Sequence, residues 1–295
     1  MSNIVRALRL PFLSASVIPF IFGSLIPGGR LNLPGFLFGI LCAACTHLSA
    51  NLINDYADSK SGVDWQDRNF YNFFGGSKLI QEKVFSEEFY LRLALFFAAL
   101  ATVFAVLLAL AIKNLSVIWF YLIIITLGWL YTQKPLQFSY HRAGEIFIFL
   151  LFGPAIVMGA YFIQTGIFPD AKSFILSLPF GFLTCAILFA NEVPDYTDDK
   201  KAAKFTWVSL TGLKCAFILY AALIACAFFT VWLGITLKYI TPVAILSFIL
   251  IIPAIQAAYI LKEYSGDKIR LMTSSKITIL IQGLTGIMLI IGVLR

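Results

Sequence analysis

The residues best suited to chemistry in this 295-residue sequence form two acidic patches. The first covers positions 47–58, with further acids at 64 and 67, and the second covers positions 191–201. A shift of 140 positions superimposes the rare polar residues of the two patches. The matched pairs are Asn51 with Asn191, Asp55 with Asp195, Tyr56 with Tyr196, Asp58 with Asp198 and Lys60 with Lys200. The match indicates one functional element that occurs twice in the chain.

The spacing of the first patch is that of a helix face. Polar side chains recur three or four positions apart, at His47, Asn51, Asn54, Asp55 and Asp58. If one helix continues through them, these side chains share one face of it. Ionisable groups in an otherwise apolar helix are costly and usually functional. We therefore expect the polar face to point away from lipid.

Carboxylates that converge from two helices repel one another unless cations neutralise them. Hard oxygen ligands suit Mg²⁺, which commonly bridges one or two carboxylates to substrate phosphates. Nearby Lys and Arg side chains can complete a diphosphate clamp, and the clamp stabilises the charge on a departing diphosphate. Two solvated helix ends are the simpler alternative for a single patch, but two matched copies favour a metal–diphosphate site. Such a site could ionise an allylic diphosphate beside an apolar cavity that holds its lipid tail.

The elements that must position these patches are membrane spans. Hydrophobic residues make up 60% of the chain, charged residues 13%, and the mean hydropathy is +0.89. Soluble domains carry about 25% charged residues, and apolar runs of about 20 residues indicate membrane spans. The net charge of +7 is spread between apolar runs, which fits membrane topology and not nucleic-acid binding. The composition therefore predicts an integral membrane protein.

Apolar runs bounded by charged or turn residues predict nine transmembrane helices in an all-α bundle. The expected ranges are 11–28, 34–57, 89–112, 115–133, 144–166, 172–193, 212–236, 240–262 and 274–293. Most Lys and Arg then fall on the side that holds the N-terminus, so the positive-inside rule makes that side cytoplasmic. Of the 15 acids, all but Asp170 fall on this side too. Both acidic patches are thus expected at the cytoplasmic face of a multi-pass inner-membrane protein.

Several motifs resemble those of the UbiA superfamily of membrane prenyltransferases, and most closely its 1,4-dihydroxy-2-naphthoate polyprenyltransferase branch. The first is N-D-Y-A-D-S-K-S-G-V-D at 54–64, and the second is N-E-V-P-D-Y-T-D-D-K at 191–200. Shorter matches are Arg9-Leu-Pro-Phe, Gly75-Gly76-Ser77 with Ile80-Gln81, Phe152-Gly153-Pro154 and the run Gly159–Gly166. The similarity covers about residues 5 to 215, and nine spans is also the family architecture.

The resemblance implies a single transmembrane domain over residues 1–295, in two pseudo-repeated halves of roughly 1–140 and 141–295. It implies a Mg²⁺-dependent enzyme that transfers a polyprenyl group from polyprenyl diphosphate to an aromatic acceptor. In the naphthoate branch, which serves menaquinone biosynthesis, transfer to the carboxylated ring carbon is accompanied by loss of CO₂. Other UbiA-type acceptors remain alternatives, namely 4-hydroxybenzoate, homogentisate or a haem. Outside this class, a secondary transporter is the main competitor.

Carried over residue by residue, the resemblance implies the following site. Catalytic and metal-binding roles fall on Asp55, Asp58, Asp195 and Asp199. Substrate-binding roles fall on Arg9, Asn51, Asn54, Asp64, Arg68, Lys134, Asn191 and Lys200. One departure follows the second motif, where the family usually has a Gly-Lys-Arg-like run and this chain has Ala203-Lys204-Phe205. Compared with the family pattern, this chain therefore lacks one basic residue that could contact phosphate.

Other polar residues and one connection have two interpretations each. His47 could bind the acceptor or orient a carboxylate, or it could simply pack in the core. Cys42 and Cys45 form a C-x-x-C pair inside an apolar run, where small packing residues are the expected role. The connection 59–87 is either a partly helical lid over the site or an ordinary loop, and Gly75-Gly76 with mixed charges around them favour the lid.

Overall fold

The computed structural model describes residues 2–294, which form helices joined by turns and loops. In chain order the elements are α1 (Asn3–Ala7), η1 (Leu10–Leu13), α2 (Ser14–Leu25), α3 (Leu33–Ser61), η2 (Val63–Trp65), α4 (Glu87–Ile112), α5 (Ser116–Leu130), η3 (Phe138–Tyr140), α6 (Gly144–Leu150), η4 (Leu151–Ala155), α7 (Ile156–Thr165), α8 (Ala171–Lys201), α9 (Val208–Thr211), α10 (Ala216–Thr236), η5 (Pro242–Leu250), α11 (Ile251–Glu263) and α12 (Lys268–Val293). The predicted all-α, polytopic membrane bundle is confirmed.

Seven helical stretches in the described part of the chain are long and apolar enough to cross a membrane. They are Leu33–Ser61, Glu87–Ile112, Gly144–Thr165, Ala171–Lys201, Ala216–Thr236, Pro242–Glu263 and Lys268–Val293. Two shorter apolar stretches, Leu10–Leu25 and Ser116–Leu130, correspond to the first and fourth expected spans. Each expected range therefore has a helical counterpart, while the exact number of spans and the cytoplasmic N-terminus stay predictions.

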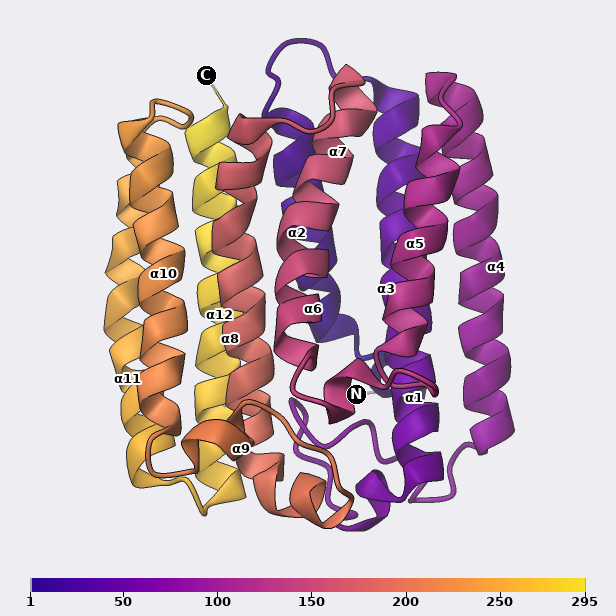
Figure 1. The fold of residues 1–295 in the computed structure, drawn as a ribbon, viewed down its shortest axis with the longest axis vertical. Coiled ribbons are helices and arrows are strands. Elements are labelled where there is room, and N and C mark those ends of the chain that lie inside the picture. Colours follow the sequence, from indigo (N-terminus) through magenta and orange to yellow (C-terminus); the bar gives the residue numbers. More distant parts are fainter. Residues whose placement is uncertain (1, 295) are drawn as a thin grey trace.

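The helices run side by side, with the long loops gathered at one end of the bundle (Figure 1). In this view α3, α4 and α5 form one side, α8 and α10–α12 form the other, and α2, α6 and α7 lie between them. The N-terminus lies near the loop-rich end and the C-terminus at the opposite end. Burial separates central from peripheral helices, since 72% of the most apolar window of α8 is buried against 22% for α4.

The helices α3 and α8 both extend beyond the expected 34–57 and 172–193, so each acidic patch lies inside a helix. Gly62, at a φ of 87°, ends α3 in a left-handed conformation that glycine adopts without strain. In α8, Lys200 and Lys201 occupy the last turn, where basic side chains complement the helix dipole. The acidic residues thus stay on regular helix faces up to the loop-rich end.

A π-helical turn, η4, interrupts the stretch Gly144–Thr165. Pro154 lies within η4, where its missing N–H cannot continue the regular hydrogen-bond ladder. Directly before it, Gly153 packs against Gly181 of α8, and a Cβ on Gly153 would lie 2.7 Å from the Gly181 Cα. This close approach packs η4, which contains Phe152, against α8, which carries the second patch.

Candidate active site

The first patch is held by hydrogen bonds from segments far away in the sequence. Asp55 is 2% exposed, and its Oδ2 accepts a hydrogen bond from the Ser77 N–H at 3.1 Å. Its Oδ1 lies 3.5 Å from Nη1 of Arg9. One turn along α3, Asp58 Oδ1 accepts a hydrogen bond from the Tyr140 hydroxyl at 2.7 Å. The two aspartates are therefore buried in fixed orientations.

The second patch has matching contacts from other segments. Asp195 Oδ2 accepts a hydrogen bond from the Gly75 N–H at 2.9 Å. Asp198 lies 2.7 Å from Nζ of Lys268, which opens α12. Asp199 Oδ1 lies 3.5 Å from Nζ of Lys204. Each aspartate of α8 thus faces a cation or a backbone donor that belongs to another element.

The 62–86 connection joins the two patches. Two of its backbone N–H groups, at Gly75 and Ser77, donate to Asp195 and Asp55 respectively. Gly75 and Gly76 have φ of 71° and 75°, a left-handed conformation that glycine adopts without strain. At Gly76 a Cβ would lie 2.8 Å from Asp64 Oδ2, so glycine is also required by the available space. The connection is therefore an ordered covering of the acidic end of the bundle.

Three lysines, Lys78, Lys204 and Lys268, lie among these carboxylates. Lys204 spans the two patches, because its Nζ lies 3.7 Å from Asp58 Oδ2 as well as 3.5 Å from Asp199 Oδ1. Burial disfavours its charged form, but the Asp199 and Asp58 carboxylates outweigh this and raise the pKa of Lys204 well above its ordinary value. Lys78, 4% exposed, donates to Asp64 Oδ1 at 2.9 Å. Burial raises the pKa of Asp64 to about 7, although the Lys78 ammonium opposes that shift.

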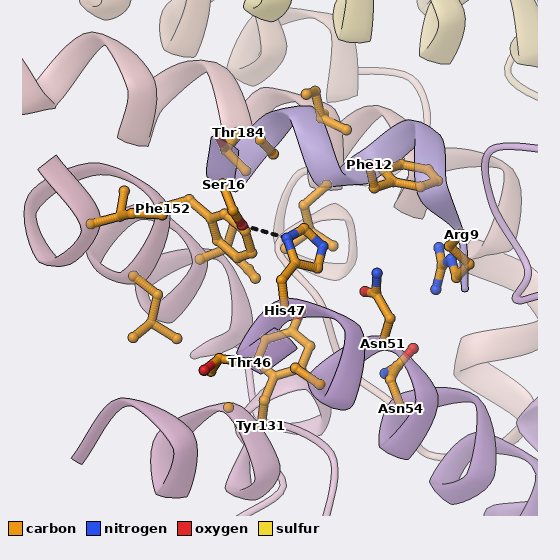
Figure 2. A pocket seen from close by; sticks show the side chains of 18 of the residues that line it. Arg9, Phe12, Ser16, Thr46, His47, Asn51, Asn54, Tyr131, Phe152 and Thr184 are labelled. Carbon is orange, nitrogen blue, oxygen red and sulfur yellow. Dashed lines mark hydrogen bonds between the residues drawn. The ribbon is translucent and has the colours of Figure 1, made fainter. Parts of the chain in front are cut away.

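A cavity of about 620 Å³ opens below these charged groups. Its charged end is lined by the two patches and the three lysines, and its interior is lined by aromatic and aliphatic side chains from several helices. Figure 2 shows part of this wall, with Arg9, Asn51 and Asn54 on one side of His47 and Phe152 on the other. The site therefore combines an anion- and cation-binding end with an apolar chamber that suits a lipid chain.

The structure brings most of the predicted site residues to this one cavity. Its lining includes Arg9, Asn51, Asn54, Asp58, Asp64, Asn191, Asp195 and Asp199. Asp55 is held directly behind this lining by Arg9 and Ser77.

Three predicted substrate contacts lie elsewhere. Arg68 is exposed and sits over the Trp65 ring, 5.3 Å from its centroid. Lys134 is exposed in the turn after α5. Lys200 is exposed because it follows Asp199 by one position, and a one-residue step turns about 100° around a helix. The structure does not bring these three side chains to the cavity.

Six charged residues line the cavity without having been predicted as site residues: Asp67, Lys78, Glu192, Asp198, Lys204 and Lys268. Lys78 follows Gly75-Gly76-Ser77 directly, so its motif was available as a signal. Lys204 belongs to the run Ala203-Lys204-Phe205, which departs from the family pattern, and its Nζ lies near Asp58 and Asp199. Lys268 carries no comparable signal, since only the fold places the start of α12 beside α8.

The donor set fits a divalent cation that is bound together with an anionic substrate. No group of three or more ligating side chains is already drawn together among residues 2–294. Several oxygens are nevertheless buried without a hydrogen-bond partner in this range, including Asp55 Oδ1 and Asn191 Oδ1. Carboxylate and amide oxygens are the ligands that Mg²⁺ prefers, and Mg²⁺ usually shares its coordination with substrate phosphates and water.

This fold and site define a polytopic helical membrane protein whose cavity has a charged end and an apolar chamber. The UbiA prenyltransferase family matches residues 16–280, and the chain belongs to this family. The chain is 30% identical over 234 residues to a 1,4-dihydroxy-2-naphthoate octaprenyltransferase of Bacillus subtilis, covering 77% of this chain and 72% of that protein. It is also 30% identical to UbiA prenyltransferase domain-containing protein 1 of Mus musculus, covering 76% of this chain and 65% of that longer protein.

A solved structure has the same fold. It is a UbiA homologue from Archaeoglobus fulgidus bound to GPP and Mg²⁺, with a TM-score of 0.59 and 16% identity, covering 98% of this chain and 99% of that one. At this identity the likeness concerns the fold. Family membership favours the prenyltransferase interpretation over the transporter alternative.

Proposed function

We propose that this protein transfers a polyprenyl group from polyprenyl diphosphate to an aromatic acceptor, with 1,4-dihydroxy-2-naphthoate as the first candidate. Transfer to this acceptor would be accompanied by loss of CO₂ and would serve menaquinone biosynthesis. The reaction would take place at the cytoplasmic side of the inner membrane, where the positive-inside rule puts the charged end of the cavity. 4-Hydroxybenzoate, homogentisate and a haem remain the alternative acceptors.

One observation carries this proposal: a single cavity joins an acid- and lysine-lined end to an apolar chamber. A polyprenyl diphosphate has the same two parts, a charged head and a long apolar tail. The head would lie between α3 and α8, and the tail would lie between the helices of the chamber. A transporter for a small polar solute would need no chamber of this apolar character.

The charged end suggests roles for the residues around it. Arg9, Lys78 and Lys204 would neutralise and hold the diphosphate oxygens. Mg²⁺, when bound, would be held by Asp55, Asp58, Asp195 and Asp199 and would neutralise charge on the diphosphate. The C1–O bond of the substrate then breaks, and its electron pair leaves with the diphosphate. The allylic carbon next forms a bond to a ring carbon of the acceptor, which loses CO₂ or a proton.

The choice of acceptor rests on the sequence relatives. The Bacillus subtilis protein that is 30% identical is named for 1,4-dihydroxy-2-naphthoate. The motifs G-G-S-x-x-I-Q at 75–81 and N-D-Y-A-D at 54–58 also resemble that branch. The murine relative at 30% identity bears a name without an acceptor, so the acceptor is the part of the proposal that most needs a direct assay.

The deciding experiment is prenyl transfer in membranes that contain this protein. Labelled polyprenyl diphosphate and Mg²⁺ are offered with 1,4-dihydroxy-2-naphthoate in one reaction and 4-hydroxybenzoate in another. A decarboxylated prenyl-naphthoquinol that disappears with a chelator would support both reaction and acceptor. Turnover of 4-hydroxybenzoate alone would replace the acceptor and keep the reaction. Absence of diphosphate binding would overturn the prenyltransferase proposal.

A further inference from the structure

His47 is a polar side chain deep in the cavity that binding of diphosphate does not explain. It lies on α3 two turns below Asp55, about 12 Å further along the helix axis. The side chain is 7% exposed and lines the cavity. The two halves differ here, because the 140-residue shift that matches the aspartates places Ile187 opposite His47. His47 is therefore not part of the repeated diphosphate element.

The imidazole ring is held in one orientation by two contacts. Nδ1 is hydrogen-bonded to the hydroxyl of Ser16 on α2, as Figure 2 shows. On another side the ring meets Phe152 edge-on, with centroids 5.2 Å apart and an interplanar angle of 77°. A ring fixed in this way presents its second nitrogen in a defined direction.

Among residues 2–294, the hydrogen bond of the His47 ring is the one between Nδ1 and Ser16, so the second ring nitrogen, Nε2, is left for the cavity that His47 lines. In Figure 2 the ring lies between Ser16 on one side and Asn51 and Arg9 on the other. Buried polar groups in proteins are nearly always hydrogen-bonded. An oriented, unpartnered nitrogen on the wall of a cavity is therefore suited to a group of the bound substrate.

We propose that Nε2 of His47 accepts a hydrogen bond from a ring hydroxyl of the aromatic acceptor, and that Ser16 is the positioning residue. This inference rests on the proposed function and deepens it. When Ser16 accepts the Nδ1–H, a neutral imidazole presents its Nε2 lone pair to the cavity. A hydroxyl that donates to this lone pair fixes the ring and raises the electron density of its carbons.

The position of His47 agrees with the geometry of the transfer. The allylic carbon is bonded to the diphosphate, so the acceptor must meet it on the chamber side of the aspartates. His47 lies on that side, and the nearby wall supplies apolar and hydroxyl groups, among them Tyr131, Phe152 and Thr184. The hydroxyl of Thr184 is also buried without a partner in the described range. A flat ring with polar substituents suits such a wall.

The test compares His47→Asn, His47→Gln and Ser16→Ala with the unchanged protein. Asparagine can keep the bond near Nδ1 but removes Nε2, whereas glutamine places an amide close to the Nε2 position. The chain has two histidines, so His141→Asn, in an exposed loop, is the matched control. Equilibrium binding of 1-hydroxy-2-naphthoate and of 4-hydroxybenzoate is measured in the presence of Mg²⁺ and a non-reactive prenyl thiodiphosphate. Steady-state KM values for acceptor and prenyl diphosphate are measured alongside.

We expect His47→Asn to weaken acceptor binding and raise the acceptor KM roughly tenfold to hundredfold. Thiodiphosphate affinity and the KM for prenyl diphosphate should stay within about twofold, as for His141→Asn. Ser16→Ala should show a smaller loss, and His47→Gln a partial recovery relative to His47→Asn. Unchanged acceptor binding in His47→Asn would overturn the inference.

The two proposals fail differently. A protein that binds thiodiphosphate but neither hydroxylated ring would overturn the role of His47 and leave diphosphate chemistry in place. A protein that binds no thiodiphosphate at all would overturn the proposed function itself.

Discussion

The two acidic helices α3 and α8 carry matching carboxylates at the charged end of one cavity, but most of the groups that contact these carboxylates differ. Asp55 on α3 faces Arg9 from the N-terminal segment, and Asp195 on α8 is bound by a backbone N–H at Gly75. Lysines face the rest of the α8 patch, and one of them also reaches Asp58. Duplicated carboxylates with unequal counter-charges support our proposal that both helices would hold one shared Mg²⁺–diphosphate cluster, with the cations at separate positions of the substrate.

The largest expected effect comes from the ligands that the halves share. Asp55→Asn and Asp195→Asn keep the size of each side chain and remove its charge. If both patches bind one cluster, each change should lower prenyl transfer roughly 100-fold or more, measured as kcat in membranes. The control is Asp170→Asn at the opposite end of α8, where asparagine also caps the helix. Full activity in one of the two active-site variants would show that the patches are not equivalent.

A smaller loss is expected from the lysine that connects the patches. Lys204→Met removes the one ammonium within 4 Å of both Asp58 and Asp199, among the residues described. We expect prenyl transfer to fall roughly tenfold to hundredfold, because a buried cation that stabilises the leaving group is lost. Lys200→Met, four residues earlier and exposed, is the matched control. Equal losses in both variants would contradict the assignment of the phosphate contact to Lys204.

The acidic patches show where the sequence was sufficient. The patches could be predicted because helical spacing alone places Asn51, Asp55 and Asp58 on one face, and because the pattern recurs 140 positions later. The nine apolar runs likewise predicted the helices, since each run is long enough to span a bilayer. Both features are local in sequence.

Contacts that depend on loops could not be predicted in this way. Lys204 leaves the end of α8 and folds back over it, a path that the local sequence does not specify. The reach of Lys268 to Asp67 and Asp198 depends on the packing of α12 against α8. Long basic side chains in loops can point in many directions, so tertiary packing decides which of them meet the substrate. The same reason accounts for Arg68 and Lys134, which were expected at the site and lie outside the cavity lining.

The loop that links the two patches should be sensitive to one added methyl group. In Gly76→Ala the new Cβ would lie 2.8 Å from Asp64 Oδ2, and Asp64 is itself held by Lys78. We expect roughly a tenfold loss of activity with a raised KM for prenyl diphosphate. The reason is that the loop must move away from Asp55 and Asp195, to which its backbone N–H groups donate.

Gly62→Ala is the control for backbone strain in this comparison. Gly62 also has a positive φ, of 87°, but nothing lies within 4 Å of the position of its Cβ. It should lose about 1 kcal/mol of stability and little activity. If Gly62→Ala lowers activity as much as Gly76→Ala, strain alone would account for both results.

The smallest effect concerns Lys268, which ties the loop to α8 through Asp67 and Asp198. Partial burial disfavours ionised Asp67, but hydrogen bonds from Lys268, Asn69 and Tyr71 outweigh it and lower its pKa to about 2 from 3.8. Because the folded pKa is depressed, this contribution is complete above about pH 4 and is lost as the pH falls through 2. Since this ion pair is partly open to solvent, we expect it to add about 1 kcal/mol to the free energy of unfolding.

The measurement is thermal unfolding of the unchanged protein and of Asp67→Asn in detergent, between pH 6 and pH 2. The unchanged protein should have the higher Tm at pH 6, and the difference should shrink steeply toward pH 2, where Asp67 is protonated in the unfolded state and about half protonated in the folded state. A Tm difference that stays constant over this range would mean that Asp67 acts through packing and not through its charge. In that case the tie between the loop and α8 would not depend on the ion pair with Lys268, and the unequal cations of the two helices would matter for substrate binding alone.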